Sequence, residues 1–173
     1  YRQALEYHNR SLKIRKKIGD KRGIALSFNN IGSHLVNLGD TSKALEYLGW
    51  SLKIREEIGD KEGVSLALNN IGTIYKKQGN FPKALEYFER SLKIRENIGD
   101  KKGLAQSLNN IGAIYYAQNA IPKALEFTLK SKQIGLELGF PKVIGNAAKL
   151  LKAIYQKTGN YKLALENQEL FIQ

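Results

Sequence analysis

A single five-residue pattern recurs every 40 residues along this chain. Leu-Asn-Asn-Ile-Gly occupies residues 68–72 and 108–112, and Phe-Asn-Asn-Ile-Gly occupies residues 28–32. A second marker, Ala-Leu-Glu, keeps the same spacing and begins at Ala4, Ala44, Ala84, Ala124 and Ala164. A fixed period of this length is typical of repeat arrays, in which each unit packs on its neighbours. We therefore expect an array that builds a surface rather than an active site.

Each 40-residue period contains two segments with helical periodicity. In residues 22–38 the apolar residues follow the spacing of one helical face: Ile24, Phe28, Ile31 and Leu35. In residues 41–58 a second stripe follows: Leu45, Leu48 and Leu52. Gly39 and Asp40 separate the two segments, and this pair suits a helix end with positive φ followed by an N-cap. Because the connection is short, we expect the two helices to be antiparallel.

The segment Ile-Gly-Asp-Lys joins one hairpin to the next. It stands at residues 18–21, 58–61 and 98–101, and again combines a C-terminal glycine with an aspartate cap. The expected organisation is one continuous all-α array. Its units are the second helix of a truncated repeat (1–20), three full repeats (21–60, 61–100 and 101–140) and a divergent last repeat (141–173). Since the chain lacks methionine and starts in the middle of a unit, we expect a fragment of a longer protein.

A glycine recurs inside the first helix of three repeats, at Gly32, Gly72 and Gly112. Glycine within a helix costs about 1 kcal/mol relative to alanine, so close packing is expected to compensate. The residues expected opposite these glycines are small ones on the second helix: Ala44, Ala84 and Ala124.

The residues at these positions resemble the tetratricopeptide repeat (TPR). In the second repeat they are Leu68, Ile71, Gly72, Tyr75, Ala84, Leu85 and Phe88. The resemblance covers essentially the whole chain, although the standard unit is about 34 residues long and ends with a proline that is missing here. It implies a right-handed α-solenoid of antiparallel helix hairpins, the TPR superhelix, with nine helices in this chain.

The longer unit is similar to the TPR regions of bacterial sensor kinases and cyclases and, more distantly, to kinesin light chain and spindle-orientation adaptors. This resemblance implies a protein- or peptide-binding scaffold that forms the sensory or interaction region of a larger signalling protein. In the family, the concave groove is lined mainly by the first helix of each repeat.

Polar residues on the first helices are therefore the candidate peptide contacts. They are Asn29, Ser33, Asn37, Asn69, Thr73, Lys77, Asn109, Tyr116 and Lys149. An asparagine can pair with both the N–H and the C=O of an extended peptide. Replacing Asn29, Asn69 and Asn109 by alanine is thus expected to abolish binding and leave stability nearly unchanged. The second asparagines are secondary candidates, with the alternative that they bridge neighbouring repeats: Asn30, Asn70 and Asn110.

The last repeat departs from the others at its first helix. Lys149, Leu150 and Lys152 replace the two asparagines and the interior glycine, and Gly139-Phe140-Pro141 replaces the usual junction. We expect this repeat to serve as a cap of the array or as a junction to a further segment of the parent protein. Lys149 would bring positive charge to one end of the groove.

The net charge of +12 is unevenly distributed. Residues 1–22 hold eight of the 28 Lys and Arg residues, whereas a phosphate-tracking surface needs a continuous basic stripe. The recurring Lys13/Arg15, Lys53/Arg55 and Lys93/Arg95 are expected on a solvated outer face, as is Trp50. We therefore expect no nucleic-acid partner, although basic charge favours acidic peptides through steering.

No pattern in the chain indicates chemistry. Cysteine is absent, no phosphate loop is present, and His8 has no second ligand nearby in the sequence, so we expect neither catalysis, nor a cofactor, nor a metal. No apolar run approaches the ~20 residues of a membrane span. Cytoplasmic and periplasmic locations both remain open. The alternative function is a structural or self-associating spacer that dimerises through its exposed ends.

Overall fold

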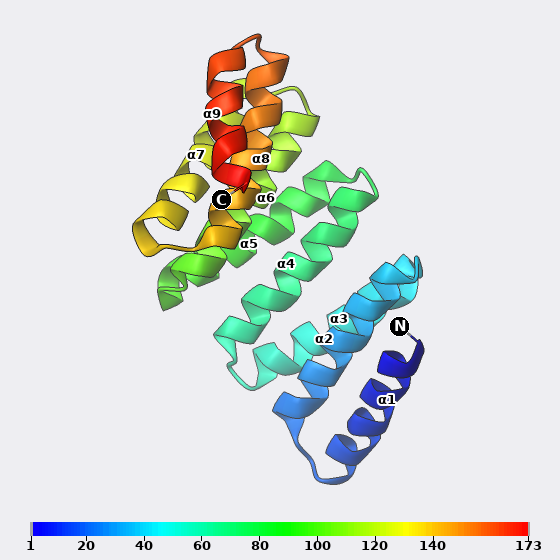
Figure 1. Cartoon of the computed structure of the whole chain (residues 1–173). Coiled ribbons are helices and arrows are strands. Elements are labelled where there is room, and N and C mark those ends of the chain that lie inside the picture. Colours follow the sequence, from blue (N-terminus) through cyan, green and yellow to red (C-terminus); the bar gives the residue numbers. More distant parts are fainter. Residues whose placement is uncertain (1, 173) are drawn as a thin grey trace. The chain divides into compact units, whose positions relative to one another are not determined.

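The computed structural model describes residues 2–172, together with the side chains of residues 6–169. Two terminal residues of the expected array, Tyr1 and Gln173, lie outside the described residues, and so does the side chain of Ala4. The described part of the chain forms nine helices: α1 (Arg2–Lys17), α2 (Lys21–Asn37), α3 (Thr41–Glu57), α4 (Lys61–Lys77), α5 (Phe81–Ile98), α6 (Lys101–Ala117), α7 (Ile121–Leu138), α8 (Pro141–Lys157) and α9 (Tyr161–Ile172) (Figure 1). None of them is long and apolar enough to cross a bilayer.

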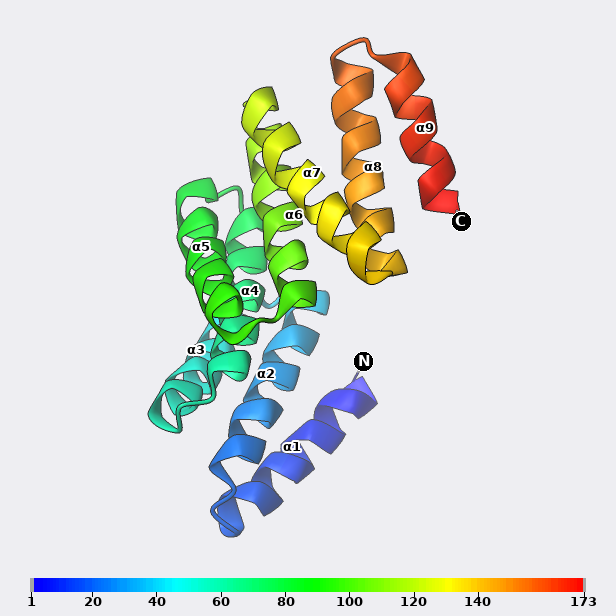
Figure 2. The same ribbon diagram turned by 90° about the vertical axis from the view of Figure 1, so that its left-hand side faces the viewer.

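The helices group into two compact units, Tyr1–Ile94 and Arg95–Gln173. In the first unit α2 packs against α1 and α3, and α3 packs against α4. In the second unit α7 packs against α6 and α8, and α9 returns antiparallel to α8 (Figure 2). The all-α class and the helical hairpins expected from the sequence are thus confirmed.

The turn between α2 and α3 depends on a glycine and a capping side chain. Gly39 has a φ of +84°, and the Asp40 Oδ1 then accepts a hydrogen bond from the Lys43 backbone N at 3.2 Å. A residue with a Cβ would be strained at this φ, which is why glycine ends the helix. The expected short antiparallel connection is confirmed.

The junctions between hairpins use the same device. Asp20, Asp60 and Asp100 each cap the following helix, and their Oδ1 atoms accept from a backbone N three residues later at 2.8, 3.1 and 2.8 Å. The capped residues are Gly23, Gly63 and Gly103. Since each cap satisfies an otherwise unpaired helix N–H, the helix starts are fixed locally.

The interior glycines do lie in close contact, but with a different partner. A Cβ on Gly32 would stand 2.8 Å from Leu48 Cγ and 3.1 Å from the Ala44 carbonyl oxygen. At Gly72 the nearest atoms belong to Phe88. The expectation of small residues facing small ones is therefore incomplete: the glycine mainly makes room for the side chain one turn beyond the alanine.

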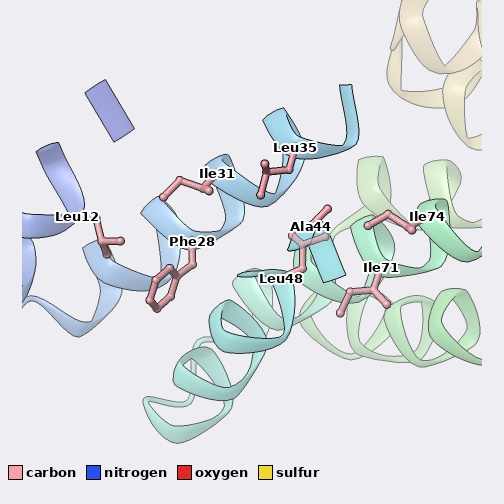
Figure 3. Packing of buried hydrophobic residues seen from close by; sticks show 8 residues of the cluster. All are labelled: Leu12, Phe28, Ile31, Leu35, Ala44, Leu48, Ile71 and Ile74. Carbon is pink, nitrogen blue, oxygen red and sulfur yellow. The ribbon is translucent and has the colours of Figure 1, made fainter. Parts of the chain in front are cut away.

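A cluster of buried apolar side chains in the first unit joins four helices. Figure 3 shows Ala44 and Leu48 of α3 between the side chains of α2 and those of α4. The other members of the cluster are Leu12, Phe28, Ile31, Leu35, Ile71 and Ile74. The α2–α3 hairpin thus buries its apolar side chains partly between its own two helices and partly against α4, as neighbouring units of repeat arrays do.

The recurring arginines are not on a solvated outer face, so that expectation was wrong. Arg55 and Arg95 are only 6% and 3% exposed. Arg55 Nη1 lies 2.9 Å from Asp60 Oδ2, and its Nε donates to Ser51 Oγ at 3.2 Å. Arg95 Nη1 donates to the Gly103 carbonyl oxygen and, at 3.1 Å, to Ser107 Oγ. These arginines hold successive hairpins together, whereas Lys53 and Lys93 are exposed as expected.

The last junction replaces this arginine contact by apolar packing. Gly135 stands 40 residues beyond Arg95, and Val143 stands 40 residues beyond Gly103. A Cβ on Gly135 would lie 3.0 Å from a methyl carbon of Val143. At this junction the glycine, Gly135, lies on α7 and the larger side chain, Val143, lies on α8, whereas at the preceding junction Arg95 lies on α5 and Gly103 on α6.

Candidate functional site

A pocket of about 230 Å³ opens between α2 and α4 in the first unit. Its lining residues are Ser33, Val36, Asn37, Leu48, Asn70, Thr73, Ile74 and Lys77. Five of these are residues that the sequence placed in the groove: Ser33, Asn37, Asn70, Thr73 and Lys77. The structure thus brings together candidates from two neighbouring first helices.

The floor of the pocket is apolar and its rim is polar. Leu48 and Ile74 are buried and Val36 is half-buried, whereas Asn37 and Lys77 are exposed. Leu48 and Ile74 were not among the predicted contacts, because in the sequence they read as ordinary core residues. Among the described residues, the lining contains one ammonium group and no carboxylate.

Two hydrogen bonds order the polar side of the pocket. Thr73 Oγ1 donates to the Asn69 carbonyl oxygen at 2.9 Å. Asn70 Nδ2 donates to Asn29 Oδ1 at 3.0 Å and so joins α4 to α2. The bridging role that the sequence left open for the second asparagine is therefore present at Asn70.

Asn29 is placed differently from the expected ligand contact. Its side chain is 5% exposed and its Oδ1 accepts from Asn70, so it belongs to the interface between hairpins. Removing it leaves the Asn70 amide short of a partner, which costs free energy. We therefore now expect alanine at this position to lower stability, unlike the nearly unchanged stability expected from the sequence. Asn30, Asn69 and Asn110 are half-buried.

In the second unit the equivalent bridge is missing. Asn109 stands 80 residues beyond Asn29, and its buried Oδ1 has no hydrogen-bond partner among the described residues. The residue 80 positions beyond Asn70 is Leu150, which has no polar side-chain atom to donate. Asn109 thus retains the acceptor of the Asn29–Asn70 bridge, whereas leucine replaces the donor at residue 150.

Tyr116 lies between α6 and α8. Its hydroxyl donates to the Ala153 carbonyl oxygen over a long 3.5 Å, and the Lys157 Nζ lies 5.3 Å from the ring centroid. Lys149, the remaining predicted contact, is exposed on α8.

Basic charge is concentrated beside the first-unit pocket. Lys76 precedes Lys77, is half-buried, and places its Nζ 5.9 Å from the Phe88 ring centroid. Burial, and then the neighbouring Lys77, lower the pKa of Lys76 below its usual value. Lys77 is thus the charged residue of the described pocket lining, and Lys76 lies against α5.

His8 does have a histidine neighbour, contrary to the expectation from the sequence. Its Nε2 lies 3.2 Å from the Nε2 of His34, which comes from the next helix. Two imidazoles are too few for a typical protein metal site. Among the residues that the structure describes, no group of three or more His, Cys, Asp or Glu side chains comes together to hold a metal.

Trp50 is 42% exposed, as expected, but it is not isolated. Its ring centroid lies 5.3 Å from that of Phe28 and 5.0 Å from that of Tyr47. The three rings pack on one another on the α2–α3 hairpin, so much of this indole supports the hairpin itself.

Solved structures with the same fold come from several kinds of protein. BtubC (BKLC) from P. vanneervenii is 18% identical, with a TM-score of 0.75 over 98% of this chain and 90% of that one. A Rap protein in complex with competence and sporulation factor is 16% identical, with a TM-score of 0.77 over 97% and 57%. The TPR-sensor protein of the signal transduction ATPases with numerous domains from Pyrococcus horikoshii is 20% identical, with a TM-score of 0.79 over 99% and 27%. The chain thus spans just over half of the Rap protein and about a quarter of the ATPase.

These similarities show the fold, which is the α-solenoid of helical hairpins expected from the sequence. No curated protein matches the chain. The family model of the tetratricopeptide repeat matches residues 1–57 and 63–134, which leaves the divergent α8–α9 hairpin outside the match. The chain belongs to the tetratricopeptide repeat family.

Proposed function

We propose that this chain is a protein-interaction scaffold that binds a peptide segment of a partner across α2 and α4, as the sensory or interaction region of a larger signalling protein. The pocket lined by Ser33, Asn37, Asn70, Thr73 and Lys77 is the observation that carries the proposal. Its volume of about 230 Å³ lies below the ~300–1,000 Å³ of typical small-molecule sites. It suits one side chain of a longer ligand.

The chemistry of the pocket supports a peptide ligand. An apolar floor takes a side chain, while the amides and hydroxyls of the rim can pair with peptide N–H and C=O groups. Lys77 favours acidic residues next to the inserted side chain. The signalling context is supported by the Rap complex with competence and sporulation factor and by the ATPase with a TPR sensor.

Selection from an unbiased library tests the proposal. Random peptides displayed on phage are selected on the protein, and the enriched sequences are synthesised and titrated by calorimetry. Lys77→Gln is expected to weaken binding by about tenfold, because it removes the ammonium group of the described pocket lining. Lys53→Gln, the same change at an exposed position of α3, serves as the control and should have no effect. Failure to enrich any peptide, or equal affinity of both variants and the wild type, would overturn the proposal.

A second candidate function is self-association through α1. Tyr7, Ile14 and Ile18 are 69%, 60% and 70% exposed and line an open hollow with Arg10, Ser11 and Asp20. Clustered exposed apolar side chains are typical of an interaction site. Analytical ultracentrifugation distinguishes the two functions: a dimer that Ile14→Glu converts to a monomer supports a spacer, and a monomer at micromolar concentration excludes it.

A further inference from the structure

The pocket of the first unit has a counterpart 80 residues further along the chain. Val36 corresponds to Tyr116, Thr73 to Ala153 and Lys77 to Lys157. These residues lie on α6 and α8, which contact each other as α2 and α4 do. The two places can therefore be compared position by position.

In the second unit, the chain's own tyrosine lies where the pocket lining would be. The Tyr116 ring lies beneath the Lys157 ammonium, with 5.3 Å from Nζ to the ring centroid. The phenol reaches across to the Ala153 carbonyl oxygen on α8. Tyr116 is half-buried in this position. In the second unit an aromatic ring of α6 thus packs against α8, below a lysine at the C-terminal end of α8.

The first unit keeps an isoleucine and a lysine at two equivalent positions, Ile74 for Ile154 and Lys77 for Lys157, whereas Leu48 and Asn70 stand where the second unit has Thr128 and Leu150. Val36, at the position of Tyr116, has a shorter side chain and lines the pocket of about 230 Å³. Lys77 stands where Lys157 stands and is exposed at the rim. The main chain of Thr73 takes the place of Ala153.

We infer that the pocket between α2 and α4 binds an aromatic side chain of the partner peptide, with tyrosine as the model occupant. The inference rests on the proposed function and names its anchor residue. The ring packs on Val36, Leu48 and Ile74, the Lys77 ammonium lies over its face, and a tyrosine hydroxyl donates to the carbonyl oxygen of Thr73. Since the described lining has a lysine and no carboxylate, acidic residues flank the anchor.

A host peptide with one variable position measures the preference for an aromatic anchor. The probes are Ac-Ser-Glu-Xaa-Glu-Ser-NH2 with Tyr, Phe, Leu or Ala at Xaa, titrated to millimolar concentration and followed by amide chemical shifts. We expect Tyr and Phe to bind about 3- to 30-fold more tightly than Leu, and Ala to bind most weakly. Shifts should centre on residues 36, 73 and 77. Equal binding of all four peptides, or no binding of the Tyr peptide, would overturn the inference.

Exchanging the two equivalent residues gives a reciprocal test. Val36→Tyr should fill the first pocket from within and abolish binding of the Tyr peptide. Tyr116→Val should open the counterpart in the second unit and raise the stoichiometry from one peptide to two. The double variant should bind one peptide, with shifts moved to residues 116, 153 and 157. Far-UV circular dichroism reports whether each variant folds. If Val36→Tyr does not fold, weaker binding of the Tyr peptide to Lys77→Gln tests the location of the anchor independently.

Failure of the aromatic anchor and failure of the peptide-binding function give different results. A phage-selected peptide that binds at residues 33–77 without any aromatic residue contradicts the aromatic anchor and leaves the peptide-binding function standing. Absence of any selected peptide contradicts both. Unchanged binding of the Tyr peptide to folded Val36→Tyr contradicts the location of the anchor.

Discussion

Leu150→Asn tests whether the second unit lacks a polar bridge that the first unit makes. Asn70 Nδ2 donates to Asn29 Oδ1 at 3.0 Å, whereas the equivalent Asn109 Oδ1 is buried and unpaired beside an apolar position. An amide at residue 150 should donate to that oxygen. The bridge would then join α6 to α8 as it joins α2 to α4.

Two opposing terms set the size of the effect. The new hydrogen bond, which also pairs the buried acceptor, contributes about 0.5–1.5 kcal/mol. Leu150 is half-buried, so losing its side chain costs about 1 kcal/mol of apolar transfer. The single variant should therefore change stability little. The coupling free energy between residues 109 and 150 isolates the bridge and should be about 1 kcal/mol, favourable.

A double-mutant cycle measures this coupling. Wild type, Asn109→Ala, Leu150→Asn and the double variant are unfolded in urea and followed by far-UV circular dichroism, with equal m values required for all four. Leu150→Ala reports the loss of leucine alone. A coupling below about 0.3 kcal/mol, or one that destabilises the protein, would refute the reasoning.

Three further changes test other contacts. Arg55→Lys should lower the unfolding free energy by about 1–3 kcal/mol, because one ammonium cannot reach both partners of the guanidinium; urea denaturation measures it. Gly32→Ala should destabilise, since its Cβ would lie 2.8 Å from a leucine carbon, whereas Gly49→Ala, with open space around it, should stabilise by about 1 kcal/mol; equal signs in thermal melts would contradict the packing. Burial, then His34 and Arg15, lower the pKa of His8, so the unfolded chain binds a proton at this residue more readily than the folded one. The free energy of unfolding should therefore decrease as the pH falls below ~6.5, the unfolded pKa. His8→Leu should reduce this pH dependence between pH 5 and 7, and an unchanged dependence would exclude His8 as its source.

The helices and their ends could be predicted because their signals are local. Gly39 and Asp40 specify a turn through φ and a cap within three residues, and the structure has both. The placement of Ser33, Thr73 and Lys77 on one pocket followed from the resemblance to the tetratricopeptide repeat, combined with helical phase and repetition. Such features need only the spacing of residues along one helix or between equivalent helices.

Contacts that depend on partners far along the chain were harder to predict. An arginine usually indicates a solvated surface, and Arg55 is buried only because Ser51 and Asp60 supply acceptors around it. A signal was present, since an aspartate follows the arginine by five residues in three successive junctions. The role of Asn29 was difficult to predict because Asn29 and Asn30 both lie near the interface between α2 and α4. Only the side-chain contacts show that Asn29 is the one that accepts a hydrogen bond from Asn70.

The two polar contacts between hairpins are replaced at the same place. Gly135 and Val143 exchange the arginine contact for apolar packing, and Leu150 removes the asparagine bridge, all where α8 meets the preceding helices. A charged contact and an amide pair allow only one register, because a shift leaves buried polar groups unpaired, whereas apolar surfaces lose less when they slide. The first junctions are therefore specified by hydrogen bonds, and the last one mainly by shape. Tyr116 adds a contact between α6 and α8 at this point, which gives that ring a structural role in the second unit.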